Sequence, residues 1–179
     1  FRRFWGAGTQ KVEQELGELF PDARVLRMDM DTTMARFSHE KHFADFSAGK
    51  YDIIIGTQMV AKGLDFPNVT LVGVLSADAS LYAQDYRSFE RAFSLFTQVV
   101  GRSGRAEKAG RAYIQTFTPE NPVIALAAAQ DYDSFYEEEI ESRRLHLYPP
   151  FCDMAGIGFS GQRAGETRAA ARRFLQELT

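Results

Sequence analysis

Short apolar segments alternate with amphipathic helical segments through most of this chain, and this alternation restricts the folds open to it. The runs Ile53–Ile55 and Val69–Leu75 are mostly apolar, which is typical of strands buried on both faces of a sheet. Helical periodicity separates the strand-like runs, as crossover connections between parallel strands require. The order predicts a doubly wound α/β fold with a parallel sheet. We expect strands at 24–28, 51–55, 69–75 and 111–117, and helices at 9–19, 36–48 and 86–100.

The predicted helices carry their own boundary and core signals. Thr9 and Asp85 are candidate N-caps, because their side-chain oxygens accept hydrogen bonds from the first free N–H groups. Gly49 is a candidate stop, since glycine readily adopts the left-handed conformation that ends a helix. The phenylalanines at helical spacing in the third helix are expected in the core rather than stacked on bases: Phe89, Phe93 and Phe96.

The pattern changes after Pro122. Helices are expected at 123–130 and 134–145, and the rigid break Tyr148–Phe151 contains two consecutive prolines. We therefore predict a first domain at 1–145 and the beginning of a small α+β domain at 146–179. That second part should hold a strand at 153–160 and a helix at 166–178. Because the chain starts without Met and ends soon after the break, we expect a fragment of a longer protein.

Charge and cysteine content exclude several classes of protein. The formal net charge is −3 at pH 7, so nucleic-acid binding would need a local patch rather than overall charge. The single cysteine, Cys152, excludes a disulfide framework and a cysteine-based zinc site within this chain. No apolar run approaches the length of a membrane span. Asp29 and Asp31 are two carboxylates without further ligands, so no metal site is predicted.

The stretch Gln98–Arg105 is a candidate nucleotide-contacting motif. It places Arg102 and Arg105 three residues apart, with Gly101 and Gly104 beside them. Each guanidinium is a permanently charged planar fork that matches phosphate oxygens, and glycine permits a turn close to a ligand. Two such forks suit a triphosphate whose terminal phosphoryl group is leaving. The alternative is that both arginines form ordinary surface ion pairs.

A second candidate site follows the strand that ends near Ile55. Thr57 and Gln58 offer hydroxyl, amide and backbone N–H groups that suit a DNA phosphate backbone. Lys62 adds a positive charge, and Gly63 lets the chain turn. Asp65 could accept a hydrogen bond from a ribose hydroxyl or orient an arginine of the other motif. An ordinary strand-to-helix loop is the alternative.

Between the two motifs lies a segment rich in charge, Asp78–Arg91. Arg87 and Arg91 are four residues apart on one helix face, so they could reach DNA phosphate. Asp85 and Glu90 are near enough to pair with them, and such pairing is the alternative interpretation.

These stretches resemble known helicase motifs. Gln98–Arg105 is similar to motif VI, Q-x-x-G-R-x-G-R, of superfamily 2 helicases, and Gly56–Phe66 resembles motif V. The middle segment resembles the pattern A-D-x-x-L-x-x-P-D-[FY]-R-[AS]-x-E-R of the PriA family of replication-restart helicases. Gln84 departs from the usual proline, and Val100 and Ser103 stand where alanine is frequent. The matching positions are Asp78, Leu81, Asp85, Arg87, Glu90 and Arg91.

The resemblance implies the second RecA-like lobe of a 3′→5′ DNA helicase that restarts stalled replication forks. It implies ATP and Mg²⁺ shared with an N-terminal lobe that carries the Walker motifs, and zinc in the parent protein outside this chain. The implied catalytic residues are Arg102, Arg105 and Gln98. Nucleotide contacts fall to Gly63, Asp65 and Gly101, and DNA contacts to Thr57, Gln58 and Lys62.

The implied partners are forked or single-stranded DNA, other primosome proteins and single-stranded DNA-binding protein, in the bacterial cytoplasm at the nucleoid and without a membrane. The fragment alone should not hydrolyse ATP, because the Walker motifs are absent from it. Two alternatives remain: a stand-alone, non-catalytic module that binds DNA or protein, and an α/β domain whose arginines are all ion-paired. A Walker lysine encoded upstream of Phe1 would favour the helicase.

Overall fold

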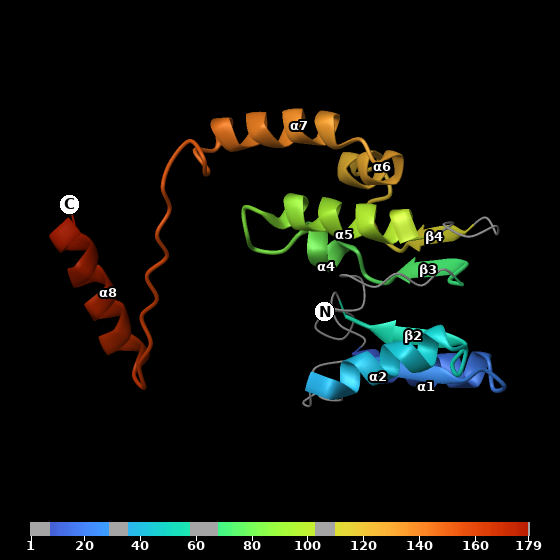
Figure 1. Cartoon of the computed structure of the whole chain (residues 1–179). Coiled ribbons are helices and arrows are strands. Elements are labelled where there is room, and N and C mark those ends of the chain that lie inside the picture. The colour runs from blue at the N-terminus through green and yellow to red at the C-terminus, as the bar shows by residue number, and fades with distance from the viewer. Residues whose placement is uncertain (1–7, 29–35, 58–67, 103–109, 179) are drawn as a thin grey trace. The chain divides into compact units, whose positions relative to one another are not determined.

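A computed structural model of the protein describes residues 8–28, 36–57, 68–102 and 110–178, without the side chains of 36–39 and 102 (Figure 1). Within these ranges the chain combines helices with parallel strands, as the sequence predicts. It divides into two compact units, residues 1–139 and residues 140–179, and the division falls inside a helix. The predicted domain boundary at 145 stays a prediction.

The first strand pair joins β1 (Val25–Met28) to β2 (Ile53–Gly56) in parallel, with Val25 opposite Ile53. Helices α1 (Thr9–Leu19) and α2 (Arg36–Ser47) pack against it. Gly49 ends α2 at φ 73°, and its N–H donates to the Phe46 carbonyl at 3.0 Å, so the predicted stop is confirmed. The predicted cap at Thr9 is wrong, because α1 already begins at Thr9 and Gly8 takes the cap position.

An arginine–carboxylate clamp fixes the starts of the same two strands. The Arg24 guanidinium donates to both carboxylate oxygens of Asp52, at 2.9 Å and 2.8 Å, and to the Gly49 carbonyl at 2.9 Å. The Arg24 backbone N–H adds a further bond to Asp52 at 2.9 Å. Bidentate geometry of this kind holds two chain segments in one register.

The second pair joins β3 (Leu71–Val74) to β4 (Arg111–Ile114), also in parallel, with Leu71 opposite Arg111. Side chains alternate between the two faces of a strand. Val74 and Ile114 pack toward the core on one face. Leu71 and Tyr113 stay exposed at 62% and 58%, so the opposite face lacks cover among the described residues.

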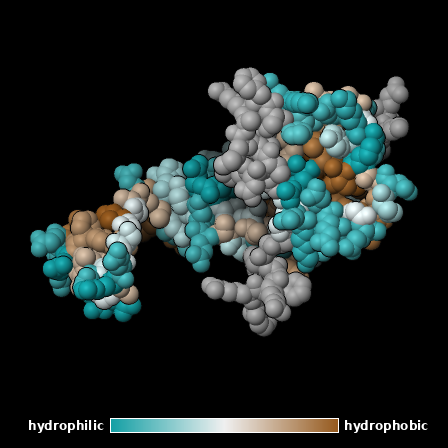
Figure 2. Space-filling model, turned by 90° about the horizontal axis from the view of Figure 1, so that it is seen from below, coloured by the Kyte–Doolittle hydropathy of each residue, from teal (hydrophilic) through white to brown (hydrophobic). Residues whose placement is uncertain are grey.

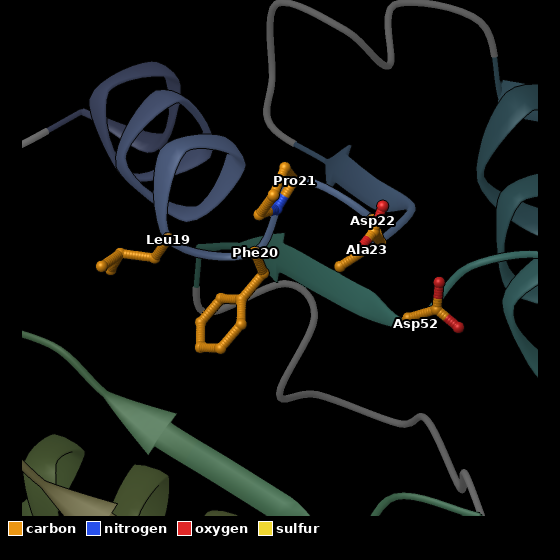
Figure 3. A pocket seen from close by; sticks show the side chains of 6 residues that line it. All are labelled: Leu19, Phe20, Pro21, Asp22, Ala23 and Asp52. Atoms are coloured by element: carbon orange, nitrogen blue, oxygen red, sulfur yellow. The ribbon is translucent and has the colours of Figure 1, made fainter.

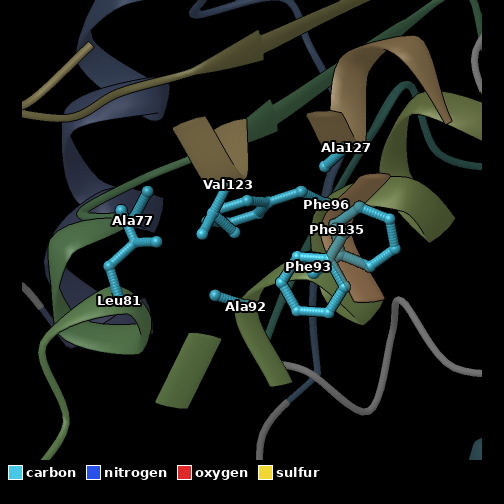
Figure 4. Packing of buried hydrophobic residues seen from close by; sticks show 8 residues of the cluster. All are labelled: Ala77, Leu81, Ala92, Phe93, Phe96, Val123, Ala127 and Phe135. Carbon is cyan, nitrogen blue, oxygen red and sulfur yellow. The ribbon is translucent and has the colours of Figure 1, made fainter. Parts of the chain in front are cut away.

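The main core forms around the helix α5 (Ser88–Arg102), which packs most extensively on α6 (Pro122–Ala129). The Phe93 ring stacks on Phe135 of α7 (Tyr132–Leu145), with centroids 4.1 Å apart (Figure 4). Phe96 is fully buried, which confirms its prediction, whereas Phe89 is 36% exposed and lies outside the core. The short helix α4 (Asp78–Leu81) adds Ala77 and Leu81 to this cluster, whose other members are Ala92, Val123 and Ala127.

Local sequence accounts for where these helices begin. The Asn121 side chain accepts a hydrogen bond from the Val123 N–H at 3.0 Å, and Pro122 occupies the first turn of α6, where its missing N–H has no cost. The sequence predicts that Asp85 caps a helix beginning at Tyr86, and this prediction is wrong. Its carboxylate accepts from the Arg87 N–H at 2.9 Å in the turn before α5, which begins at Ser88.

The C-terminal unit, residues 140–179, contains the end of α7, an extended segment and the helix α8 (Ala164–Leu178). The predicted strand at 153–160 is wrong for the described residues, which are extended but pair with no other strand. Phe159 contacts Phe174 of α8 with ring centroids 5.6 Å apart, yet both rings stay more than a third exposed. Figure 2 shows hydrophobic and hydrophilic residues mixed on the surface of this segment.

The observed strands bear out the α/β class and the parallel direction, but not a single sheet. Within the described ranges the strands form two separate pairs, β1–β2 and β3–β4. One continuous doubly wound sheet therefore stays a prediction. None of the helices in these ranges is both long and apolar enough to span a membrane.

Candidate nucleotide and DNA interface

The arginine motif begins on the last turns of α5. Gln98 lies within the helix, and Gly101 and Arg102 are its final residues. The predicted turn at Gly101 is wrong, because this glycine is helical and its φ is not positive. Glycine permits a turn but does not impose one, and the core contacts of Phe96 and Val99 continue the helix to this point. Arg105 lies outside the described residues.

Gln98, the first residue of the motif, has a side-chain oxygen that accepts no hydrogen bond from the described residues. Its side chain is half-buried, and Nε2 lies 3.4 Å from the Ser94 hydroxyl on the preceding turn. Its Oε1 is buried and finds no donor in the part of the chain that the structure describes. Buried polar atoms are nearly always paired, so this oxygen suits a donor such as an arginine N–H. It does not suit a phosphate oxygen, which is itself an acceptor.

Gly101 meets a second element rather than open space. A Cβ at this position would lie 3.2 Å from Nε2 of Gln130. Gln130 is the left-handed C-cap of α6, with φ 57°. Gly101 thus lies close to the end of α6, but the neighbouring atom is the end of a flexible side chain that can move aside.

The loop after β2 is described only at its start. Thr57 follows Gly56 directly and is exposed, at the carboxyl end of the strand. Ligands of parallel α/β sheets bind beyond these ends, so this position is compatible with a DNA contact. The remaining predicted residues of this loop lie outside the described residues: Gln58, Lys62, Gly63 and Asp65.

Asp78 is a buried carboxylate whose partners the sequence does not reveal. Only 5% of it is exposed, and it is the sole buried charged residue within the described ranges. The Thr116 hydroxyl donates to it at 3.0 Å, and the Phe117 N–H donates to both of its oxygens at 3.2 Å and 3.1 Å. It thereby ties the segment after β3 to the segment after β4. A signal was available: an acidic residue follows one apolar strand, and Thr-Phe-Thr follows another.

Arg87 and Arg91 are ion-paired, as the alternative interpretation proposed. The Arg91 guanidinium lies 2.7 Å from the Asp85 carboxylate, and the Arg87 side chain lies 3.3 Å from Glu90. These side chains remain substantially exposed, so each pair contributes little to stability. Their charge is already matched locally, which weakens the case for a contact with DNA phosphate.

A shallow pocket lies away from these motifs, between the end of α1 and the starts of β1 and β2 (Figure 3). The Arg24 side-chain hydrogen bond, aided by the Arg24 backbone N–H, lowers the pKa of Asp52 to about 2. Ligands of parallel sheets bind at the opposite ends of the strands, so this pocket is a poor candidate for the nucleotide or DNA. Its lining residues are Leu19, Phe20, Pro21, Asp22, Ala23 and Asp52.

Among the described residues, no group of three or more His, Cys, Asp or Glu side chains could hold a metal ion. The free thiol of Cys152 is half-buried and donates to the Leu147 carbonyl.

Comparison with known proteins identifies the class. Residues 7–107, more than half of the chain, match the family described as helicase conserved C-terminal domain. The chain belongs to this helicase family, and its resemblance to the PriA proteins within it is confirmed.

Replication restart protein PriA of Bacillus subtilis (strain 168) is 51% identical over 98% of this chain, which covers 22% of that relative. PriA of Chlamydia trachomatis serovar D is 48% identical over 96% of this chain, which covers 23% of that relative. PriA of Synechocystis sp. is 45% identical over 84% of this chain, which covers 18% of that relative. The chain thus spans less than a quarter of the length of these relatives.

Proposed function

We propose that this chain is the second RecA-like lobe of an ATP-dependent 3′→5′ DNA helicase that restarts stalled replication forks and promotes primosome assembly. The observation that carries the proposal is the similarity to PriA, at 51% identity over nearly the whole chain. The parallel strand pairs and crossover helices support it. In this proposal β2 and β3 join the two pairs into one doubly wound sheet.

The arginine motif would act on nucleotide bound between this lobe and an N-terminal lobe. ATP with Mg²⁺ supplies the phosphoryl chemistry when bound. Arg102 and Arg105 would neutralise the negative charge that develops on the terminal phosphoryl group. Gln98 fits as a positioning residue, because its unmet Oε1 can accept a hydrogen bond from an arginine of the motif.

The loop after β2 would hold DNA. Thr57 and Gln58 would donate hydrogen bonds to the phosphate backbone, and Lys62 would add a positive charge. Gly63 would allow the chain to turn, and Asp65 and Gly101 would lie at the nucleotide. Since one loop contacts DNA and another contacts nucleotide, opening and closing of the lobes would couple hydrolysis to strand movement.

The wider setting follows from the same similarity. The complete protein would bind forked or single-stranded DNA, together with primosome proteins and single-stranded DNA-binding protein, in the bacterial cytoplasm at the nucleoid. A zinc module would belong to the parent protein rather than to this chain.

DNA-stimulated ATP hydrolysis by the complete protein tests the proposal. The variant Arg105→Ala should lose about a thousandfold or more in turnover, with an unchanged circular dichroism spectrum. Arg91→Ala is the matched control, because Arg91 is exposed and already paired with Asp85. Unchanged turnover in Arg105→Ala, or hydrolysis by the purified 179-residue chain alone, would contradict the proposal.

A further inference from the structure

Phe117 is the most exposed of the large hydrophobic side chains within the described ranges, at 91%. It lies three residues beyond β4, at the carboxyl end of that strand. Thr116 and Thr118 flank it, and their hydroxyl oxygens lie 3.3 Å apart. An aromatic ring at this end of a parallel pair is placed where α/β sheets bind ligands.

The backbone that carries this ring is held firmly. The Phe117 N–H donates to both oxygens of the buried Asp78 carboxylate. The Thr118 N–H donates to the Thr116 hydroxyl at 3.0 Å, and the Tyr82 hydroxyl donates to the Thr118 hydroxyl at 2.9 Å. A ring presented on a fixed backbone loses little conformational freedom on binding.

The neighbouring strand ends in an unusual conformation. Ser76, two residues beyond β3, is exposed and has φ 54°, which is rare outside glycine. The Ser76 N–H donates to the Gln115 side-chain oxygen at 3.1 Å, and this bond ties it to the segment leading into Phe117. Residues held in such conformations cluster at ligand-binding sites.

We propose that Phe117 is a base-stacking residue that receives a nucleobase of single-stranded DNA, and that Ser76, beyond the end of the neighbouring strand, offers a polar contact to the same ligand. This deepens the proposed helicase function and rests on it. Base stacking needs an exposed aromatic face and adds affinity that does not depend on the charge of the ring. The formal net charge of −3 gives no general attraction for DNA, so an uncharged contact of this kind would matter here. It would supply affinity that the phosphate contacts of the loop after β2 do not.

Equilibrium binding of the complete protein to a fluorescently labelled oligo(dT) strand, measured by anisotropy at several salt concentrations, tests this inference. Phe117→Ala should weaken binding about 5- to 150-fold. The slope of log affinity against log salt should not change, because that slope counts phosphate contacts. Phe117→Trp should retain binding. The high exposure of Phe117 means that folding, checked by circular dichroism, should be unaffected.

Tyr113→Ala provides the matched control. Tyr113 is also exposed, at 58%, but it lies within β4 rather than beyond its end. Equal losses in the Tyr113 and Phe117 variants would overturn the inference, since an apolar sheet face and not one stacking residue would then be responsible. Unchanged affinity in Phe117→Ala, or an altered salt slope, would also overturn it.

The two proposals fail in different ways. Wild-type protein that binds oligo(dT) through Phe117 but hydrolyses no ATP would contradict the helicase function and preserve the stacking contact. Wild-type protein that hydrolyses ATP in an Arg105-dependent way, with Phe117→Ala binding normally, would contradict the stacking contact alone.

Discussion

Truncation of Phe96 should destabilise the chain far more than truncation of Phe89 on the same helix. Phe96 is 0% exposed and Phe89 is 36% exposed. Removing a fully buried phenylalanine ring costs about 3–5 kcal/mol. Both substitutions gain the same small helix propensity from alanine, so that effect cancels in the comparison. With a urea dependence of about 2 kcal/mol/M, Phe96→Ala should lower the unfolding midpoint by about 2 M.

Urea titration followed by far-ultraviolet circular dichroism measures this difference. Phe89→Ala should shift the midpoint by about 1 M or less, because the Phe89 ring is 36% exposed and its removal leaves no closed cavity. Similar shifts for the two variants would refute the packing described for α5. A larger midpoint shift for Phe89→Ala than for Phe96→Ala would mean that residues outside the described ranges cover the Phe89 face of the helix.

Three further outcomes follow from local contacts. Gly101→Ala should leave the urea midpoint nearly unchanged. The new Cβ would lie 3.2 Å from Nε2 of Gln130, which is the end of a flexible side chain, and alanine favours the helix. A large drop in the midpoint would show that this contact is rigid. The lowered pKa of Asp52, about 2, means that its bond to Arg24 stabilises the fold above the ordinary carboxyl pKa of 3.8 and is lost as pH falls through about 2. In Asp52→Asn, the free energy of unfolding should therefore depend less on pH in that range. An unchanged pH dependence would argue against the clamp. Arg91→Ala should leave oligo(dT) affinity unchanged, and a clear loss would assign that arginine to DNA instead.

The sequence predicts the fold where the signals are local. The strands predicted at 51–55 and 111–117 overlap β2 and β4, and helical periodicity finds α6 and α8 within two residues of their observed starts. Prediction fails where the outcome depends on a partner. Residues 153–160 alternate as a strand would, but a strand forms only when another chain segment supplies hydrogen bonds, and no described segment does so.

The sequence shows which types of residue the candidate site contains, but not what each of them contacts. The residue types and spacing around Gln98 indicate phosphate chemistry, and the structure adds the unmet oxygen of that side chain. Gly101 illustrates the limit, because glycine is compatible both with a turn and with a helix, and only the structure shows that this glycine is helical. The exposure of Phe117 could not be predicted from the sequence, since this residue falls within the strand predicted at 111–117, whereas β4 ends at Ile114.

Two residues of the PriA-like pattern make contacts that hold the fold together. Asp78 joins the ends of β3 and β4, and Asp85 pairs with Arg91 at the start of α5. Substitution of Asp78 should lower stability and ATP turnover together, whereas substitution of Arg105 should lower turnover alone. A variant of Asp78 that kept full stability but lost turnover would place this carboxylate in the chemistry and reverse that division.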